Sequence, residues 1–384
     1  MMRKITFLLI GYLLLWPPLC QHSNAQEKTG QPIDVVFCLD LSSSSNGLID
    51  HLRNHIWDFW YLLSQCSPQP NYRIAIVSYA RFSNGKKDGY TKVIRDLGTD
   101  FERMSSQLFN IPSKIEKGDQ YVGSALKTCL TKISWSKDPS AKKIIFLVGN
   151  GDVTTGPEDV DRVMDKIIEK DISVYPIYIT APGETKAIQG WQRIAMKGRG
   201  KISSINLKNL YFDNLNGFDM MRFRILNRKF NNTYLYYGKN GLANLKMMKE
   251  EDNNIYIANS QGFRFRVMYK ISEDFQKKNY SWDLVDLYYK NPVGFMKVDK
   301  ALLNDTCRKM NDKQLKSYII YKKYERKKLA TLINEMLLNK HTIDKETGLE
   351  QVRNMPTLDV QSMKVIRDIL RENGCDCNAF EFNE

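Results

Sequence analysis

The chain has 384 residues, of which 42% are hydrophobic and 26% charged, an ordinary globular composition with enough sequence for two domains. This composition excludes wholesale disorder, a collagen-like repeat and a small disulfide scaffold. The formal net charge of +14 divides evenly between the residues before and after position 210, so it favours a solvated, mildly basic surface over nucleic-acid binding.

The N-terminus has the pattern of a cleaved export signal. Arg3 and Lys4 precede an apolar run over residues 5–16, and small side chains lie at Ser23 and Ala25. We therefore expect residues 1–25 to be removed and the rest of the chain to be exported, to the periplasm or the cell surface. The run is shorter than a membrane span requires and no later stretch approaches that length, so we expect no transmembrane segment.

Six cysteines follow the signal, an even number that permits disulfides in an exported chain without requiring them. Cys38 lies in an apolar strand pattern and Cys129 in a helical one, and we interpret both as small buried hydrophobes. We expect the more reactive pair in Cys375-Asp376-Cys377. The sequence leaves the pairing open among Cys66, Cys129, Cys307, Cys375 and Cys377.

Residues 31–209 alternate apolar strands with amphipathic helices, which is typical of a parallel sheet covered on both faces. The run 33–39 ends at Asp40 and predicts a central strand, with a helix over 48–63 after it. Strands at 72–79 and 91–97, joined by a turn at 83–89, predict an antiparallel edge. We expect further strands at 143–148, 172–179 and 201–205, and further helices at 101–109, 121–134, 157–170 and 186–196. The predicted fold is α/β, a doubly wound and mostly parallel six-stranded sheet flanked by helices.

The helix at 48–63 carries two groups of side chains that could have a function. His51 and His55 lie four residues apart, a spacing that zinc enzymes use, but no Glu stands beside His51, so we interpret the pair as a solvated helix face. Four aromatic residues suit a helix that grips both a sheet and a neighbouring domain. These aromatic residues are Trp57, Phe59, Trp60 and Tyr61.

Residues 210–384 have few strand-like runs and predict a second, mainly helical region. Residues 311–340 combine an apolar stripe with many Lys and Arg, and we interpret this segment as a helix packed on a partner helix. The helical patterns lie near 216–230, 241–250, 256–272, 312–340 and 358–372.

Asp40-Leu41-Ser42-Ser43-Ser44 follows the first predicted strand, at the strand end where open α/β sheets bind ligands. Asp40, Ser42 and Ser44 offer hard oxygen ligands at alternate positions, which suit Mg²⁺ or Ca²⁺. The same five residues are equally consistent with a serine-rich helix start and an aspartate satisfied by hydrogen bonds.

This motif resembles the metal-ion-dependent adhesion site of the von Willebrand factor type A domain, whose pattern is Asp-x-Ser-x-Ser after the first strand. Around residues 232–238 and 281–286 the chain is also similar to the extension that follows this domain in an exported bacterial branch of the family. The resemblance implies a divalent ion whose open coordination position accepts a carboxylate from a partner protein. The resemblance to the domain itself rests on residues 34–40, 47–49, 73–77, 131–135 and 143–149.

The chain departs from the family at two further ligand positions. Counting back from Gly123 places Gln120 at the family's threonine, whereas aligning Gly118-Asp119 with the branch's Gly-Asp places Asp119 there, and both alignments stay open. The family's second aspartate falls on Asn150, although Asp152 stands two residues on. Because divalent-ion affinity rises with the number of charged ligands, we expect weak binding at best.

No nucleophile motif and no P-loop lysine is present in the sequence, so we predict that the protein is not an enzyme. We predict an exported protein-binding, adhesion or envelope-assembly module that acts through a divergent adhesion site. The alternative is a metal-independent scaffold in a periplasmic or surface complex. An enzyme with a site between the two regions is the third and least supported reading.

Overall fold

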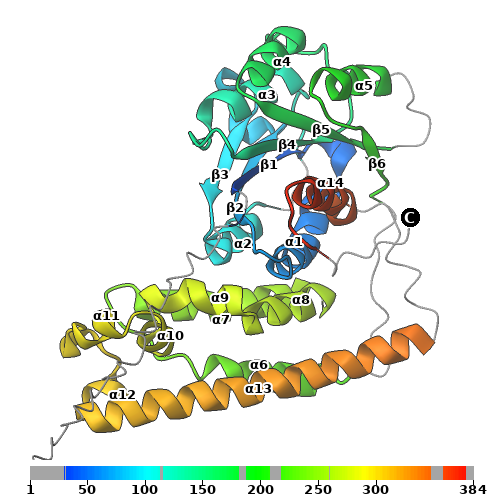
Figure 1. Cartoon of the computed structure of the whole chain (residues 1–384). Coiled ribbons are helices and arrows are strands. Elements are labelled where there is room, and N and C mark those ends of the chain that lie inside the picture. Colours follow the sequence, from blue (N-terminus) through cyan, green and yellow to red (C-terminus); the bar gives the residue numbers. More distant parts are fainter. Residues whose placement is uncertain are drawn as a thin grey trace, which may run out of the picture.

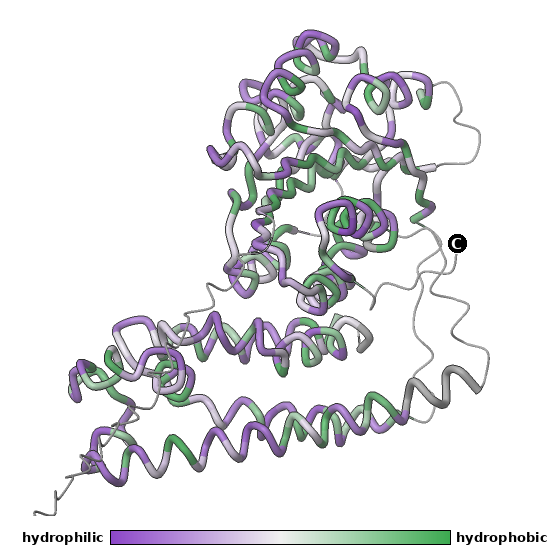
Figure 2. The backbone as a smooth tube through the Cα atoms, in the orientation of Figure 1, coloured by the Kyte–Doolittle hydropathy of each residue, from purple (hydrophilic) through white to green (hydrophobic). Residues whose placement is uncertain are grey.

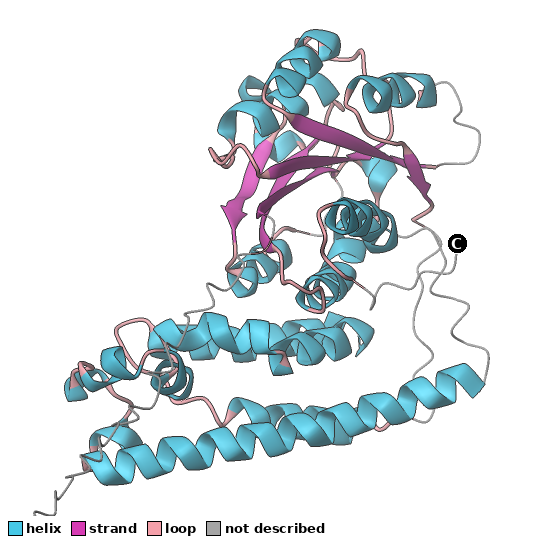
Figure 3. Ribbon diagram, viewed as in Figure 1, coloured by secondary structure: helices cyan, strands magenta, loops and turns pink. Residues whose placement is uncertain are grey.

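A computed structural model describes residues 30, 32–112, 116–180, 187–207, 218–258, 260–346 and 358–377. The predicted signal at 1–25 lies outside these residues. The strands and the helices around them form one layered body, and a second body beneath it consists of helices (Figures 1 and 3). No helix in the described ranges is long and apolar enough to cross a bilayer.

The sheet has six strands in the order β3-β2-β1-β4-β5-β6, and only the edge strand β3 is antiparallel to its neighbour. This confirms the predicted fold and the predicted antiparallel edge. Because both faces are covered, the central strands are apolar along nearly their whole length, as the hydropathy colouring of Figure 2 shows. The strands are β1 (Pro32–Asp40), β2 (Asn71–Tyr79), β3 (Lys92–Gly98), β4 (Lys142–Gly149), β5 (Ile172–Ile179) and β6 (Ser203–Ile205).

Each face of the sheet has its own hydrophobic core. Alternate residues of β1 divide between the two, with Val36 and Cys38 on one side and Val35 and Phe37 on the other. The helices on the Val36 side are α3 (Val122–Lys132), α4 (Val160–Glu169) and α5 (Ile188–Lys197). Those on the Phe37 side are α1 (Leu48–Ser64), α2 (Phe101–Phe109) and α14 (Leu358–Glu372).

Helix α14 comes from the far end of the chain yet lies beside α1 beneath the sheet (Figure 1). A disulfide joins Cys66, just after α1, to Cys377, and Ser67 and Asp376 exchange backbone hydrogen bonds of 2.7 Å. Cys375 is buried beside this disulfide. The last described residues of the predicted C-terminal region are thus fastened to the sheet-bearing body.

The predicted solvated face at His51 and His55 is wrong. The two side chains are 3% and 4% exposed because α14 covers this part of α1. The backbone N–H of Leu358 donates to His51 Nε2 at 3.2 Å, and His55 Nδ1 lies 3.1 Å from Asp58 Oδ2. The periodicity of α1 could not predict this burial, because the helix that covers the two histidines follows about 300 residues later in the chain.

The remaining helices form the second body. The predicted mainly helical C-terminal region is confirmed, and the apolar stripe of α13 packs through Leu329, Ile333 and Leu337. Short helices also occur between 273 and 308, where the sequence analysis predicted none. The helices are α6 (Met220–Asn231), α7 (Gly241–Ala258), α8 (Ser260–Ile271), α9 (Glu273–Lys278), α10 (Leu284–Lys290), α11 (Pro292–Met296), α12 (Asp305–Arg308) and α13 (Asp312–Glu346).

Helix α1 holds the two bodies together, as its aromatic residues predicted. Phe59 meets Phe37 of β1 edge-on, with ring centroids 5.4 Å apart. Trp57 turns the other way, towards α8, where the Tyr269 ring lies 6.0 Å from it and the Arg266 guanidinium stacks 4.2 Å over its ring. Helix α1 therefore packs against the sheet through Phe59 and against the helical body through Trp57.

A buried ion network crosses the same interface. Arg266 of α8 donates to Glu102 of α2 at 2.9 Å and to Asp252 of α7 at 2.6 Å, and Lys270 donates to Asp252 at 2.6 Å. Arg266 and Lys270 are completely buried. Because a buried charge without its partner is costly, these contacts oppose separation of the two bodies.

Candidate functional site

The predicted site forms where β1 and β4 end side by side. Asp40 is the last residue of β1, and Asn150 directly follows β4. Chain order reverses between these two strands, which is where open α/β sheets form ligand sites. Gly149 allows the close approach of the strands, since a Cβ there would lie 2.2 Å from Tyr79 Oη and 2.8 Å from Asp40 Cβ.

Gln120 reaches into this site from the loop before α3. Its Nε2 lies 2.6 Å from Asp40 Oδ2 and 2.8 Å from Asn150 Oδ1. The same nitrogen lies 3.1 Å from Ser42 Oγ and 2.9 Å from Ser44 Oγ. The amide nitrogen thus stands at the centre of four oxygens. We call these five side chains the Gln120 cluster.

Further hydrogen bonds connect the oxygens of the Gln120 cluster. The Ser42 backbone N–H donates to Asp40 Oδ1 at 2.8 Å, the two serine hydroxyls lie 2.9 Å apart, and Ser44 donates to Asn150 at 2.8 Å. Burial raises the pKa of Asp40, and the hydrogen bonds from Ser42 and Gln120 partly offset that rise. The carboxylate therefore depends on these donors.

Five of the six predicted ligands come together in the Gln120 cluster, and Asp119 does not join them. Asp119 is exposed and accepts a hydrogen bond of 2.9 Å from the Tyr121 hydroxyl. Asp152 does not turn back either, because its Oδ1 accepts from the backbone and hydroxyl of Thr154 at 2.9 and 2.7 Å. Of the two alignments left open by the sequence, the structure has the one that directs Gln120 inward.

The Gln120 cluster as arranged does not fit a divalent cation. Mg²⁺ needs oxygens at about 2.0–2.1 Å and Ca²⁺ at about 2.3–2.6 Å from a central point that the amide nitrogen fills here. Asp40 is the one carboxylate among the five side chains. Across the described ranges, no group of three or more His, Cys, Asp or Glu side chains gathers as metal ligands do.

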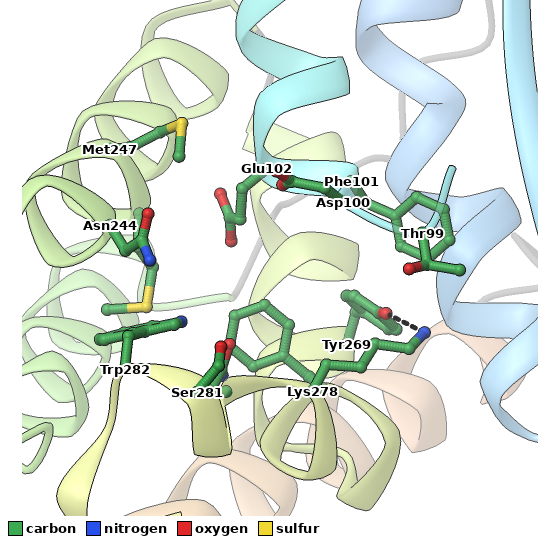
Figure 4. A pocket seen from close by; sticks show the side chains of 13 residues that line it. Thr99, Asp100, Phe101, Glu102, Asn244, Met247, Tyr269, Lys278, Ser281 and Trp282 are labelled. Carbon is green, nitrogen blue, oxygen red and sulfur yellow. Dashed lines mark hydrogen bonds between the residues drawn. The ribbon is translucent and has the colours of Figure 1, made fainter. Parts of the chain in front are cut away.

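A second candidate site lies between the two bodies. A cavity of about 240 Å³ opens between the start of α2 and helices α7 to α9. Figure 4 shows Glu102 pointing towards the wall with Asn244 and Trp282, while Lys278 lies on another wall and donates to the Tyr269 hydroxyl at 3.2 Å. Burial raises the pKa of Glu102 to about 7, although the Arg266 charge opposes the rise.

Sequence reasoning missed this cavity, and no local signal could have found it. Its walls come from residues 99–102 and from several helices between 244 and 282, and only tertiary packing brings these together. Glu102 reads in the sequence as an ordinary acidic residue in a first helical turn.

No curated protein matches the sequence. The structure is similar to proximal thread matrix protein 1 from the mussel byssus, described with a zinc-occupied MIDAS motif, with 15% identity, a TM-score of 0.37 and coverage of 47% of this chain and 43% of that one. The chain therefore spans under half the length of that protein.

Two bacterial structures are also similar. An aerotolerance-related membrane protein from Bacteroides fragilis has 15% identity and a TM-score of 0.32, with 48% of this chain and 93% of that chain covered. A von Willebrand factor type A protein from Catenulispora acidiphila has 16% identity and a TM-score of 0.34, with 46% and 39% covered. Residues 34–213 match the family described as the von Willebrand factor type A domain, and this part of the chain is such a domain.

Proposed function

We propose that the protein is an exported binding module rather than an enzyme, and that its von Willebrand factor type A domain contacts a partner protein through the loops around the Gln120 cluster. The helical body acts as the scaffold that carries this domain. The protein then acts in the periplasm or at the cell surface, because residues 1–25 have the pattern of an export signal.

One observation carries the proposal. The loops after β1 and β4 and the loop before α3 converge on one spot, and their polar side chains split into a buried set that fixes the loops and an exposed set that faces solvent. Asp40, Ser42 and Asn150 are buried, whereas Ser43 and Asp119 are exposed. A surface that is exposed yet held by buried hydrogen bonds is preorganised for binding, because little conformational freedom remains to be lost.

The metal-bridged form of this function would use an acidic side chain of the partner as a ligand to Mg²⁺ or Ca²⁺. The geometry favours the second form, a metal-independent contact, because Gln120 Nε2 stands where the ion would have to be. In this form the partner meets the exposed hydroxyls and the Asp119 carboxylate directly, so donor groups on the partner suit the surface.

Site-specific photo-crosslinking tests the proposal. A photoreactive amino acid replaces the exposed Ser43 in the full-length chain, and in the control it replaces Arg162, whose side chain is 86% exposed on α4 of the same domain. We expect position 43 to give one discrete crosslinked product with a partner protein. This product should be absent from position 162 and should disappear when an excess of unmodified protein competes for the partner.

An Asp119→Arg substitution at the exposed rim provides a second check. It should abolish the crosslink from position 43 while leaving the thermal midpoint within about 2 °C, since Asp119 is exposed and lies outside the Gln120 cluster. Equal crosslinking from both positions, or a product that Asp119→Arg leaves unchanged, would contradict a binding surface at these loops.

N-terminal sequencing of the exported chain tests the predicted removal of residues 1–25.

A further inference from the structure

The hydrogen-bonding capacity of the Gln120 cluster points to a role for Gln120 itself. Asp40 Oδ2, Ser42 Oγ, Ser44 Oγ and Asn150 Oδ1 all face one point, at 2.6 to 3.1 Å from Gln120 Nε2. The two serine hydroxyls carry hydrogens of their own, whereas Asp40 Oδ2 and Asn150 Oδ1 can only accept, so these two oxygens need a donor between them. An amide nitrogen carries two hydrogens and a partial positive charge, and it supplies what the oxygens lack.

We propose that the Gln120 amide takes the place of the cation, so that the domain keeps its binding loops in order with no metal ion. The inference deepens the proposed function by assigning the site a metal-independent form. It can be tested without knowledge of any partner, because an amide at the cation position affects metal binding and stability, and both can be measured on the protein alone.

The orientation of the amide follows from its two ends. With Nε2 inward, the two amide hydrogens can serve Asp40 Oδ2 and Asn150 Oδ1, which only accept, whereas the flipped amide would place Oε1 against these two acceptors. The outward Oε1 lies beside Gly151, where an added Cβ would come within 2.1 Å of it. Gly151 also has a φ of +89°, a left-handed conformation that glycine adopts without strain. The loop after β4 is thus shaped to leave room for the Gln120 side chain.

The charge of the Gln120 cluster agrees with a neutral occupant. Asp40 contributes one negative charge, Asn150 contributes none, and Asp119 is turned away to Tyr121. A divalent ion among one carboxylate and neutral oxygens would be weakly held. An amide that donates to that carboxylate needs no second negative charge. The same lack of charge that weakens a metal site here therefore suits an amide.

The test is the Gln120→Glu variant of the full-length chain. This change keeps the size of the side chain but replaces the central donor with a second carboxylate beside Asp40. Gln192→Glu makes the same chemical change at an exposed position in the middle of α5 and serves as the control. Thermal unfolding at pH 8 in EDTA, and in millimolar Mg²⁺, Ca²⁺, Mn²⁺ or Zn²⁺, is measured together with calorimetric titration of each ion.

We expect the unmodified protein and Gln192→Glu to give no binding heat and the same thermal midpoint in EDTA and in metal. Gln120→Glu should melt about 5 °C or more lower in EDTA, because two carboxylates then face each other, and should recover most of that loss when a cation binds between them. Circular dichroism of the variant in EDTA at low temperature checks that it is folded.

Two results would overturn the inference. Saturable binding of a divalent ion to the unmodified protein, at millimolar concentration or below, would show that the amide gives way to the ion. A Gln120→Glu variant that melts like the unmodified protein in EDTA, or one whose loss no cation reverses, would show that Gln120 does not stand at a cation position. Neither result depends on partner crosslinking, so failure of this inference and failure of the proposed function are distinguishable.

Discussion

Replacing Asp286 with asparagine should remove a pH-dependent loss of stability from the helical body. Arg326 of α13 is buried and donates to Asp286 Oδ1 at 2.9 Å and to Asp283 Oδ2 at 3.0 Å, with its guanidinium 4.0 Å over the Tyr234 ring. Two buried carboxylates thus share the Arg326 charge, and the partly exposed Lys323 ammonium lies 3.9 Å from Asp286 Oδ1. Burial raises the pKa of Asp286 to about 7, with Asp283 adding to the rise and Arg326 opposing it.

The sign of the effect follows from which state holds the proton. Above about pH 4 Asp286 is ionised in the unfolded chain but stays protonated in the folded protein up to about pH 7. The folded state then binds more protons, so the free energy of unfolding falls as pH rises through this window. A rise in pKa from 3.8 to about 7 corresponds to a loss of about 4 kcal/mol at most.

Urea unfolding followed by tryptophan fluorescence at pH 4, 6 and 8 measures this loss. Asp286→Asn keeps an oxygen that accepts from Arg326, so we expect it to match the unmodified protein at pH 4 and to exceed it by up to about 4 kcal/mol at pH 8. Asp283→Asn is the matched control. Asp283 also accepts from the backbone N–H of Leu235 at 2.8 Å and of Asp286 at 3.1 Å, so its loss should cost about 3 kcal/mol at pH 4 and less at pH 8, where Asp286 no longer ionises beside a second carboxylate. A pH profile of Asp286→Asn that parallels the unmodified protein would refute the reasoning.

Three further predictions concern the disulfide, the ion network and the loop beside Gln120. A reducing agent should lower the thermal midpoint of the unmodified protein but not that of Cys377→Ser, because the bond to Cys66 stabilises by about 2–5 kcal/mol. Arg266→Met leaves Glu102 without its cation and Asp252 with Lys270 alone, and should cost about 3–5 kcal/mol, measured by urea unfolding at pH 8; a loss under about 1 kcal/mol would contradict it. Gly151→Ala should lower the thermal midpoint and weaken the crosslink from position 43, since its Cβ displaces Gln120; unchanged values would mean that the loop adapts freely.

The sheet was predictable because its signals are local. Strands β1 and β4 are apolar runs that end at Asp40 and Gly149, β5 is an apolar run followed by Thr180, and their burial on both faces matches that composition. The helix predicted to start at Pro157 begins instead at Val160. Asp159 caps that helix, and its side chain accepts from the backbone N–H of Asp161 and Arg162, a local signal that outweighs the preference for proline in the first turn.

The inward position of Gln120 was not predictable, because it depends on contacts distant in sequence. An added Cβ at Gly118 would lie 2.3 Å from the Ala80 carbonyl oxygen, so the loop before α3 is pressed against the end of β2. That contact holds the backbone of the loop two residues before Gln120. The short helices α10 and α12, by contrast, left local signals that were overlooked, since Asp283 and Asn304 accept hydrogen bonds from the backbone three residues on.

The loops of the Gln120 cluster and the interface between the two bodies each hold a buried carboxylate that side-chain donors stabilise. Asp40 and Asp252 are both buried carboxylates, and side-chain donors neutralise or solvate each of them, Gln120 for the first and Arg266 with Lys270 for the second. Since Arg266 also bonds to Glu102 across the interface, neither body can unfold alone without leaving charge unpaired. The two bodies should therefore unfold in one cooperative transition at pH 8, with equal midpoints by fluorescence and circular dichroism. Arg266→Met should separate the two midpoints, and a single shared midpoint in that variant would mean that apolar contacts of α1 alone couple the bodies.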